Sequence, residues 1–252
     1  MISGHGMALF AASLAMLASS LAHGGEDVGP AGFASPEAVM EAFCVRLGAG
    51  DFDGAVDLFA IDAGHEPDFA GIAVSTGGIS FNGPIPAPGY TALNRQILRN
   101  TALKGIRFFV TALLLKDAFA PVAEMRPLIL HFKGPDARGQ LEAKLGEFEE
   151  ALDPARLKSL RPVRLDRIDA DDFDAAEFQR HGASPRLQDY GEFLVLYGLD
   201  GGNYVGAATM CRFEDGWRLV SPFAMLAMEK LKGAKTMPQE ITPEAYEALL
   251  AQ

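Results

Sequence analysis

The sequence predicts an α+β fold in which helices cover one face of an antiparallel sheet. Two observations favour this class. Amphipathic helix patterns come first, after residue 34, and strand patterns separated by turn residues follow between residues 193 and 221. The chain has 252 residues, of which 49% are hydrophobic and 22% charged, so it can bury one sizeable core.

A pair of helices opens the predicted domain. Ser35 is a typical N-cap and Pro36 a typical first helical residue, so the first helix is expected to begin there. Glycines at 48 and 50 end it, and Asp51 caps a second helix expected over residues 52–60. The apolar residues of the first helix recur at spacings of three and four and therefore share one face: Val39, Met40, Phe43, Cys44 and Leu47.

The middle of the chain gives weaker signals. Two short apolar runs within residues 72–81 flank a Gly-Gly pair and predict a hairpin. Residues 91–104 predict a helix, while residues 106–115 fit either a strand or a buried helix. A strand is expected over 128–132 and a helix over 140–151.

The C-terminal third has the clearest strand signals. Runs at 193–199, 204–213 and 217–221 are separated by turn residues and predict an antiparallel meander. A last short helix is expected over residues 243–250, capped by Thr242.

The first 22 residues contain no Asp, Glu, Lys or Arg and hold an apolar run at 7–17. Small residues at 20 and 22 suit a cleavage site, so residues 1–22 are expected to be a signal peptide and the mature chain to begin at His23. A buried N-terminal helix is the alternative interpretation. We expect a flexible leader over 23–34 and a periplasmic or extracellular location.

The charge balance excludes two classes of partner. A net charge of −11 argues against nucleic acid, because phosphate binding needs clustered Lys and Arg, and also against an anionic membrane surface after signal cleavage. The mature histidines are scattered, and no nucleotide or phosphate fingerprint occurs, so we expect neither a metal nor a cofactor. An apolar small molecule or a protein remains as the expected partner.

Two segments carry a family resemblance. Residues 38–63 (AVMEAFCVRLGAGDFDGAVDLFAIDA) and residues 213–223 (FEDGWRLVSPF) resemble ketosteroid-isomerase-like domains of the nuclear-transport-factor-like (SnoaL-like) superfamily. The resemblance implies a curved sheet around helices, a cone-like shape with an apolar pocket, and homodimers in many members. Because typical members are shorter, it places one domain over 35–223 with a mixed insertion at about 72–190, followed by a tail over 224–252.

The resemblance also implies pocket and catalytic positions. The expected pocket lining is Phe43, Leu47, Phe59 and Trp217. The oxyanion-donating tyrosine of the family's isomerases matches Phe43, which has no hydroxyl, and their carboxylate base matches Pro67. We therefore expect no isomerase activity. The residues left to test as a base in that stretch are His65, Glu66 and Asp68.

Two cysteines, Cys44 and Cys211, are present in a chain expected to be exported. An even count in an oxidising compartment permits a disulfide, and the elements that carry them pack together in the resembled fold. The alternative is two buried free thiols.

Three functional hypotheses follow. The first is an exported, non-catalytic module that binds a small molecule or a protein. The second is a pocket enzyme, an isomerase, dehydratase or hydrolase, with a carboxylate or His65 as base. The third is an interaction scaffold that meets its partner through the insertion, which a large exposed apolar patch there would support.

Overall fold

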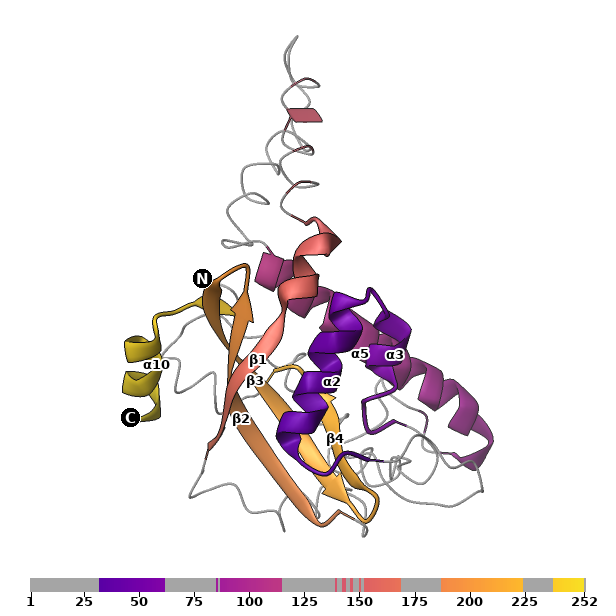
Figure 1. Ribbon diagram of the computed structural model, residues 1–252. Helices are drawn as coiled ribbons and strands as arrows, with labels where there is room; N and C mark the ends of the chain where they lie inside the picture. The colour runs from indigo at the N-terminus through magenta and orange to yellow at the C-terminus, as the bar shows by residue number, and fades with distance from the viewer. Residues whose placement is uncertain are drawn as a thin grey trace, which may run out of the picture.

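The fold is seen in a computed structural model (Figure 1). The parts of the chain that it describes are residues 32–61, 85, 87–114, 139, 142–143, 146, 150, 152–168, 187–223 and 238–251. The expected signal peptide, the hairpin at 72–81 and the strand at 128–132 lie outside these residues, and so does most of the helix at 140–151.

The fold is α+β with an open antiparallel sheet, as predicted. Four strands follow one another in the order β1-β2-β3-β4, and the short β5 pairs with the start of β3. The predicted meander is confirmed as β2 to β4, while β1 and β5 were not predicted. The strands are β1 (Arg161–Ile168), β2 (Asp189–Leu199), β3 (Gly202–Phe213), β4 (Gly216–Ser221) and β5 (Gln239–Glu240).

The turn between β2 and β3 has the chemistry that a tight hairpin requires. Asp200 has a φ of 50° and Gly201 a φ of 80°, both in the left-handed region that two-residue hairpin turns use. Asp tolerates this region better than most residues, because its short side chain can form local hydrogen bonds.

The first predicted helix is confirmed as α2 (Pro36–Gly48). The Ser35 side chain accepts a hydrogen bond from the backbone N–H of Ala38, as a capping residue should. The residues of the predicted apolar face are all buried: Val39, Met40, Phe43, Cys44 and Leu47.

The second helix is shorter than predicted. Instead of residues 52–60, α3 covers Phe52–Val56. The backbone from Leu58 to Ala60 leaves the helix to pair with β4: Leu219 N–H donates to Leu58 O at 3.0 Å, and Ala60 N–H donates to Leu219 O at 2.9 Å. Closing the sheet edge therefore takes precedence over the local helical pattern.

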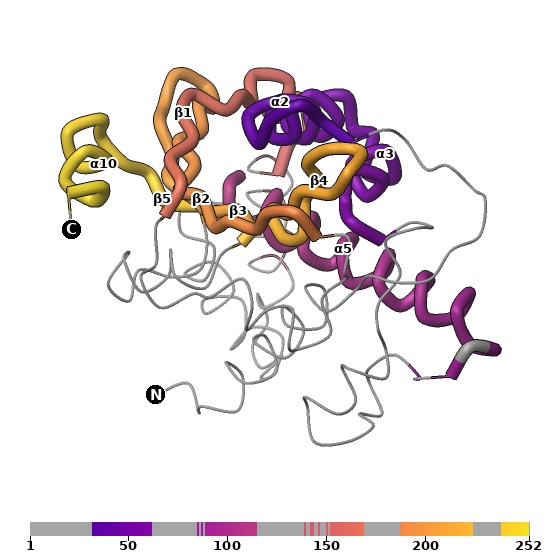
Figure 2. The backbone as a smooth tube through the Cα atoms, turned by 90° about the horizontal axis from the view of Figure 1, so that it is seen from below, coloured from indigo at the N-terminus to yellow at the C-terminus, as the bar shows by residue number. Residues whose placement is uncertain are grey.

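The predicted helix at 91–104 and the ambiguous segment at 106–115 form one helix, α5 (Thr91–Leu114), which the 3₁₀ turn η1 (Pro88–Tyr90) precedes. The helix continues through Gly105 because a single apolar face continues through it, with Ala102, Ile106 and Phe109 buried. The N-terminal half of α5 extends beyond the other described elements (Figures 1 and 2).

Alternate residues of β2 contribute to two different clusters. Val195 and Tyr197 belong to the main core with α2, α3 and α5, whereas Leu194 and Leu196 belong to a second cluster with Tyr246. Tyr246 comes from the predicted last helix, α10 (Pro243–Leu250), which Thr242 caps. The stretch 72–190 thus supplies α5, the 3₁₀ helix η2 (Pro154–Ser159) and β1 to the packed domain.

The two edges of the sheet differ. β4 is covered by other parts of the chain, because Phe33 exchanges two backbone hydrogen bonds with Trp217 and Leu58–Ala60 pairs with Leu219. β1 is the other end strand, with Pro162 and a register irregularity near its start. Among the described helices, we find none long and apolar enough to span a membrane.

Candidate functional site

The four residues expected to line a pocket are part of the main core. Phe43 and Phe109 meet edge to face with ring centroids 5.6 Å apart, and Phe193 and Trp217 do so at 6.1 Å. Leu47 and Phe59 are fully buried in the same cluster. These side chains hold α2, α3, α5 and the sheet together. The candidate bases His65, Glu66 and Asp68 lie outside the described residues.

Cys44 and Cys211 are both buried and both free. Of the two alternatives, the structure therefore has free thiols, and the predicted disulfide is not formed. Cys44 affects the pKa of Tyr197, near one end of β2, whereas Cys211 pairs with Tyr190, near the other end. These tyrosines are seven positions apart on β2, or roughly 23 Å along the strand, so the two cysteines lie toward opposite ends of it, whereas bridged cysteines have Cα atoms about 4–7 Å apart.

Burial keeps these thiols and the neighbouring phenols protonated. It raises the pKa of Cys44 to about 12 and also raises the pKa of Cys211. The pKa values of Tyr190 and Tyr197 are raised by the same cause, with a further increase for Tyr190 from the charge of Glu192. A thiol must ionise to act as a nucleophile, so neither cysteine is activated at neutral pH.

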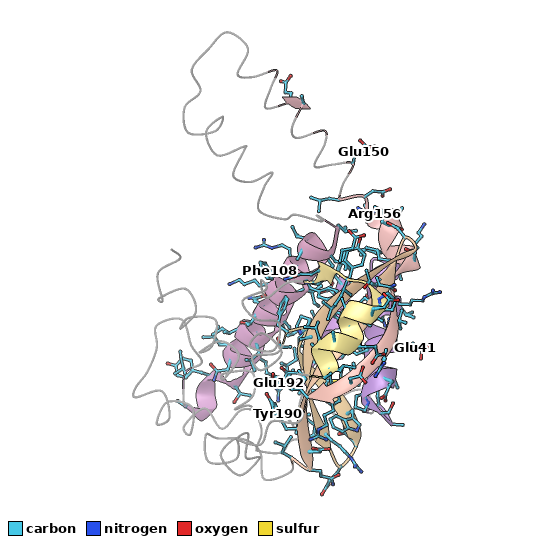
Figure 3. All side chains as sticks on the ribbon, turned by 90° about the vertical axis from the view of Figure 1, so that its left-hand side faces the viewer. Glu41, Phe108, Glu150, Arg156, Tyr190 and Glu192 are labelled. Atoms are coloured by element: carbon cyan, nitrogen blue, oxygen red, sulfur yellow. The ribbon has the colours of Figure 1, made fainter. Side chains whose placement is uncertain are left out.

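A buried polar band crosses the sheet at the end of β2 that carries Tyr190. Glu192 and Arg218 are each only 3% exposed. On β3, Thr209 is the register partner of Glu192, and Cys211, two residues further along, is the register partner of Arg218. The Thr209 hydroxyl donates to Phe223 O at 2.8 Å, and Arg218 donates to Asp215 at 2.5 Å. Figure 3 shows Tyr190 and Glu192 close together on β2. We did not predict this band. The sequence does indicate it, because Glu192 is a charged residue within an otherwise apolar strand.

The second candidate site is the solvent-facing side of α5, which we call the α5 outer face. The residues that define it follow one another at spacings of four and three and therefore lie in one stripe. Leu93 is 49% exposed, and Tyr90, in the preceding turn, is 47% exposed. The stripe consists of Leu93, Ile97, Asn100, Lys104 and Arg107, with Tyr90 at its N-terminal end.

The charge on α5 is of one sign only. Residues 91–114 contain four basic and no acidic residues, in a chain with 33 acidic and 22 basic residues in total. Arg99 reaches across to α3 and donates to the Asp57 carboxylate at 2.8 Å. Lys104 and Arg107 are exposed on the outer face, and no ion pair joins either of them to another described residue.

The α5 outer face therefore combines exposed apolar side chains on the projecting N-terminal half of the helix (Figure 2) with basic side chains further along it that form no ion pair with another described residue. The helix at 91–104 was predicted, but its exposed side was not identified as a site. The available signal was the run of 24 residues without an acid, which is unusual for a solvated helix in an acidic chain.

Comparisons with known proteins gave one kind of match. No protein-family model and no curated protein matches the chain. Among solved structures, the chain is similar to a cystatin-like protein from Ruminococcus gnavus, with a TM-score of 0.52 and 16% sequence identity. The match covers 88% of this chain and 45% of that protein, so our chain spans less than half of its length. At this identity, the likeness concerns the fold alone.

This finding corrects the resemblance seen in the sequence. The match is to a cystatin-like fold, and no comparison supports the ketosteroid-isomerase-like superfamily, so that identification was wrong. The physical reason is that both quoted segments carry only local signals. A capped helix pair and a strand–turn–strand pattern form under the same rules in many α+β folds, and neither specifies the order of the strands.

Proposed function

We propose that this chain is an exported, non-catalytic protein-interaction module that contacts its partner through the α5 outer face. The observation that carries the proposal is the exposed side of α5, which presents Tyr90 and Leu93 at its projecting N-terminal half and Lys104 and Arg107 about 16–21 Å further along the helix. Exposed aromatic, aliphatic and basic side chains on one convex element match the composition of protein–protein interfaces, in which Tyr and Arg are enriched.

The inner side of α5 supports this assignment. Leu98, Ile106 and Phe109 are buried in the main core, so the helix is held rigidly at the end that packs. A rigid helix presents its outer side chains with little loss of conformational entropy on binding. The helix also lies within residues 72–190, the stretch through which a scaffold was expected to meet a partner.

The non-catalytic part of the proposal is supported by the titratable groups of the main core. Burial holds Cys44 and Tyr197 in their neutral forms, away from the pKa range that nucleophiles and general bases need at neutral pH. Both lie among apolar side chains that pack helix against sheet.

The export part is supported by the uncharged first 22 residues. Mass spectrometry of the protein recovered from an exporting host tests it. We expect a mature N-terminus at His23. Recovery of the uncleaved chain from the cytoplasm would contradict this part of the proposal.

Site-specific photocrosslinking in the source organism tests the interaction. A photoreactive amino acid replaces Leu93 in one variant and Val45, 63% exposed on α2, in the control. We expect one discrete protein adduct from position 93, none from position 45, and a weaker adduct when Tyr90→Ser is added. Equal adducts at both positions, or none at position 93, would reject the α5 outer face as the interface.

A second candidate function, enclosed binding of a small polar molecule, is favoured by the buried polar band. Glu192 and Arg218 place a carboxylate and a guanidinium on one side of the sheet, and Thr209 and Tyr190 add hydroxyl groups, so a polar molecule bound there would exchange with contacts that these side chains already make. Native mass spectrometry of the purified protein tests it. We expect a retained adduct that Glu192→Gln abolishes while the protein stays folded; an adduct-free native protein would reject it.

A further inference from the structure

We infer that the partner surface contacting the α5 outer face is acidic: a protein segment that sets carboxylates against Lys104 and Arg107 and an apolar side chain against Tyr90 and Leu93. The inference rests on the proposed function and adds the chemistry of the partner.

The first argument is the arrangement of charge within α5. Lys104 and Arg107 are three residues apart, so two like charges are neighbours on the helix surface. No acid within residues 91–114 can compensate them, and like-charged neighbours destabilise a helix. Carboxylates of a partner placed against Lys104 and Arg107 would remove this repulsion.

The second argument contrasts the two sides of the helix. Arg99, toward α3, already has the Asp57 carboxylate as an internal partner. Lys104 and Arg107, toward solvent, pair with no carboxylate in the described parts of the chain. Among the described residues, the charge toward α3 is thus neutralised within the chain, whereas the charge on the α5 outer face is open to an external group.

The third argument excludes a second copy of this chain. The commonest homodimer has a two-fold axis and sets the same patch of each copy against the other. Such a contact would bring Lys104 and Arg107 of both copies to one interface with no acid on either α5. Like charges placed together in an interface cost affinity.

The fourth argument disfavours an anionic membrane. Lys104 and Arg107 would be attracted to it, but the chain as a whole carries a net charge of −11. The apolar residues of α5 that could insert are mostly committed to the core, which leaves Tyr90, Leu93 and the half-buried Ile97. Stable attachment to a membrane surface needs more buried apolar area than this.

The test uses the full chain and a defined probe. The probe is a fluorescent amphipathic helical peptide with Glu on its polar face and Leu and Phe on its apolar face, and its control has Gln in place of Glu. The protein variants are Lys104→Glu with Arg107→Glu and, as a matched control, Lys158→Glu with Arg161→Glu. The control changes net charge equally at exposed sites on η2 and β1.

We expect the first double variant to weaken binding of the Glu peptide by about tenfold or more and the control variant to change it by less than about twofold. The Gln peptide should bind at least about tenfold more weakly than the Glu peptide. Added salt should lower the affinity for the Glu peptide and leave the affinity for the Gln peptide unchanged. Circular dichroism and thermal unfolding of each variant establish that it is folded.

Three outcomes would overturn the inference. They are equal effects of both double variants, equal binding of the two peptides, and binding to phosphatidylglycerol vesicles that is lost with Lys104→Glu and Arg107→Glu. The photocrosslinking experiment separates the two proposals. A discrete adduct at position 93 without selective binding of the Glu peptide would leave the α5 outer face as an interface and reject an acidic partner.

Discussion

Two buried tyrosines differ in what their hydroxyl groups contact. The Tyr246 hydroxyl donates to Asp166 Oδ2 at 2.8 Å and lies 3.2 Å from Leu194 O. The Tyr197 hydroxyl is fully buried and has no hydrogen-bond partner in the described structure. A buried polar group without a partner loses its hydration and gains nothing in return.

Replacing each tyrosine by phenylalanine should therefore have opposite effects. Tyr197→Phe removes an uncompensated hydroxyl and should raise the free energy of unfolding by about 1 kcal/mol. Tyr246→Phe removes the hydroxyl that donates to Asp166, which keeps Arg164 as its other donor, and should lower the free energy of unfolding by about 1–2 kcal/mol. Urea unfolding of both variants measures the difference. Equal destabilisation by the two changes would contradict the assignment of the Tyr197 hydroxyl.

Burial of Cys44 predicts a loss of stability at high pH. The thiol ionises at its ordinary value of 9.0 in the unfolded chain but at about 12 in the folded chain. The folded state therefore holds a proton that the unfolded state releases, and the free energy of unfolding should fall between pH 9 and 12 by about 1.4 kcal/mol per pH unit for this group.

Urea unfolding at several pH values from 7 to 11 measures this dependence. Stability should change little through this group below pH 9 and fall above it, where other groups with raised pKa values, such as Cys211, also contribute. In Cys44→Ala the free energy of unfolding should fall less steeply with pH above pH 9, because about one proton fewer is released on unfolding. An unchanged slope would show that Cys44 does not contribute.

At the scale of elements, Arg156 on η2 joins three parts of the chain. Its Nε donates to Asp200 in the β2–β3 turn at 2.7 Å, and its Nη1 donates to Leu114 O at the end of α5 at 3.1 Å. Ser159 adds a hydrogen bond to the same Asp200 carboxylate at 2.9 Å. These contacts lower the pKa of Asp200 and hold its positive-φ turn.

Arg156→Ala should therefore loosen both the turn and the last turn of α5, and lower the free energy of unfolding by about 1–2 kcal/mol. The control, Lys158→Ala on the same 3₁₀ helix, should change it by less than about 0.5 kcal/mol because that side chain is exposed. Hydrogen exchange of the backbone amides of residues 110–114 and 199–202 shows whether the loosening is confined to these two turns. Faster exchange spread over the whole sheet instead would contradict a local role.

For the whole molecule, the start of the described chain closes one sheet edge. Phe33 N–H donates to Trp217 O at 3.0 Å, and Trp217 N–H donates to Phe33 O at 2.7 Å. Gly32 lies against the turn between β3 and β4. A Cβ atom on residue 32 would be 2.7 Å from backbone atoms of Asp215 and Gly216. An edge strand left open is prone to pair with other chains.

Removing residues up to 34 should expose the start of β4 at Trp217, lower the free energy of unfolding by about 2–3 kcal/mol and promote association. Removing residues up to 30 should have little effect, because Gly32 and Phe33 remain in place. Thermal unfolding and analytical ultracentrifugation of the two truncated chains give the comparison. Equal behaviour of both would show that Phe33 does not close the edge.

The sequence by itself determined the elements whose signals are local. Ser35 and Thr242 cap helices through their own side chains, apolar spacing defines the buried face of α2, and the Asp200–Gly201 turn sets the hairpin of β2 and β3. Each of these depends on residues a few positions apart, so a pattern in the chain is sufficient to find it.

Only the tertiary structure decided what depends on distant partners. Leu58–Ala60 leaves a helical pattern because β4 offers backbone hydrogen bonds, and α5 continues past Gly105 because its apolar face meets the core. The exposure of Leu93 and Lys104 on the same side of α5 likewise follows from which side of the helix is packed. These outcomes depend on which surfaces, far apart in the sequence, bury one another. Local propensity is too weak to decide them.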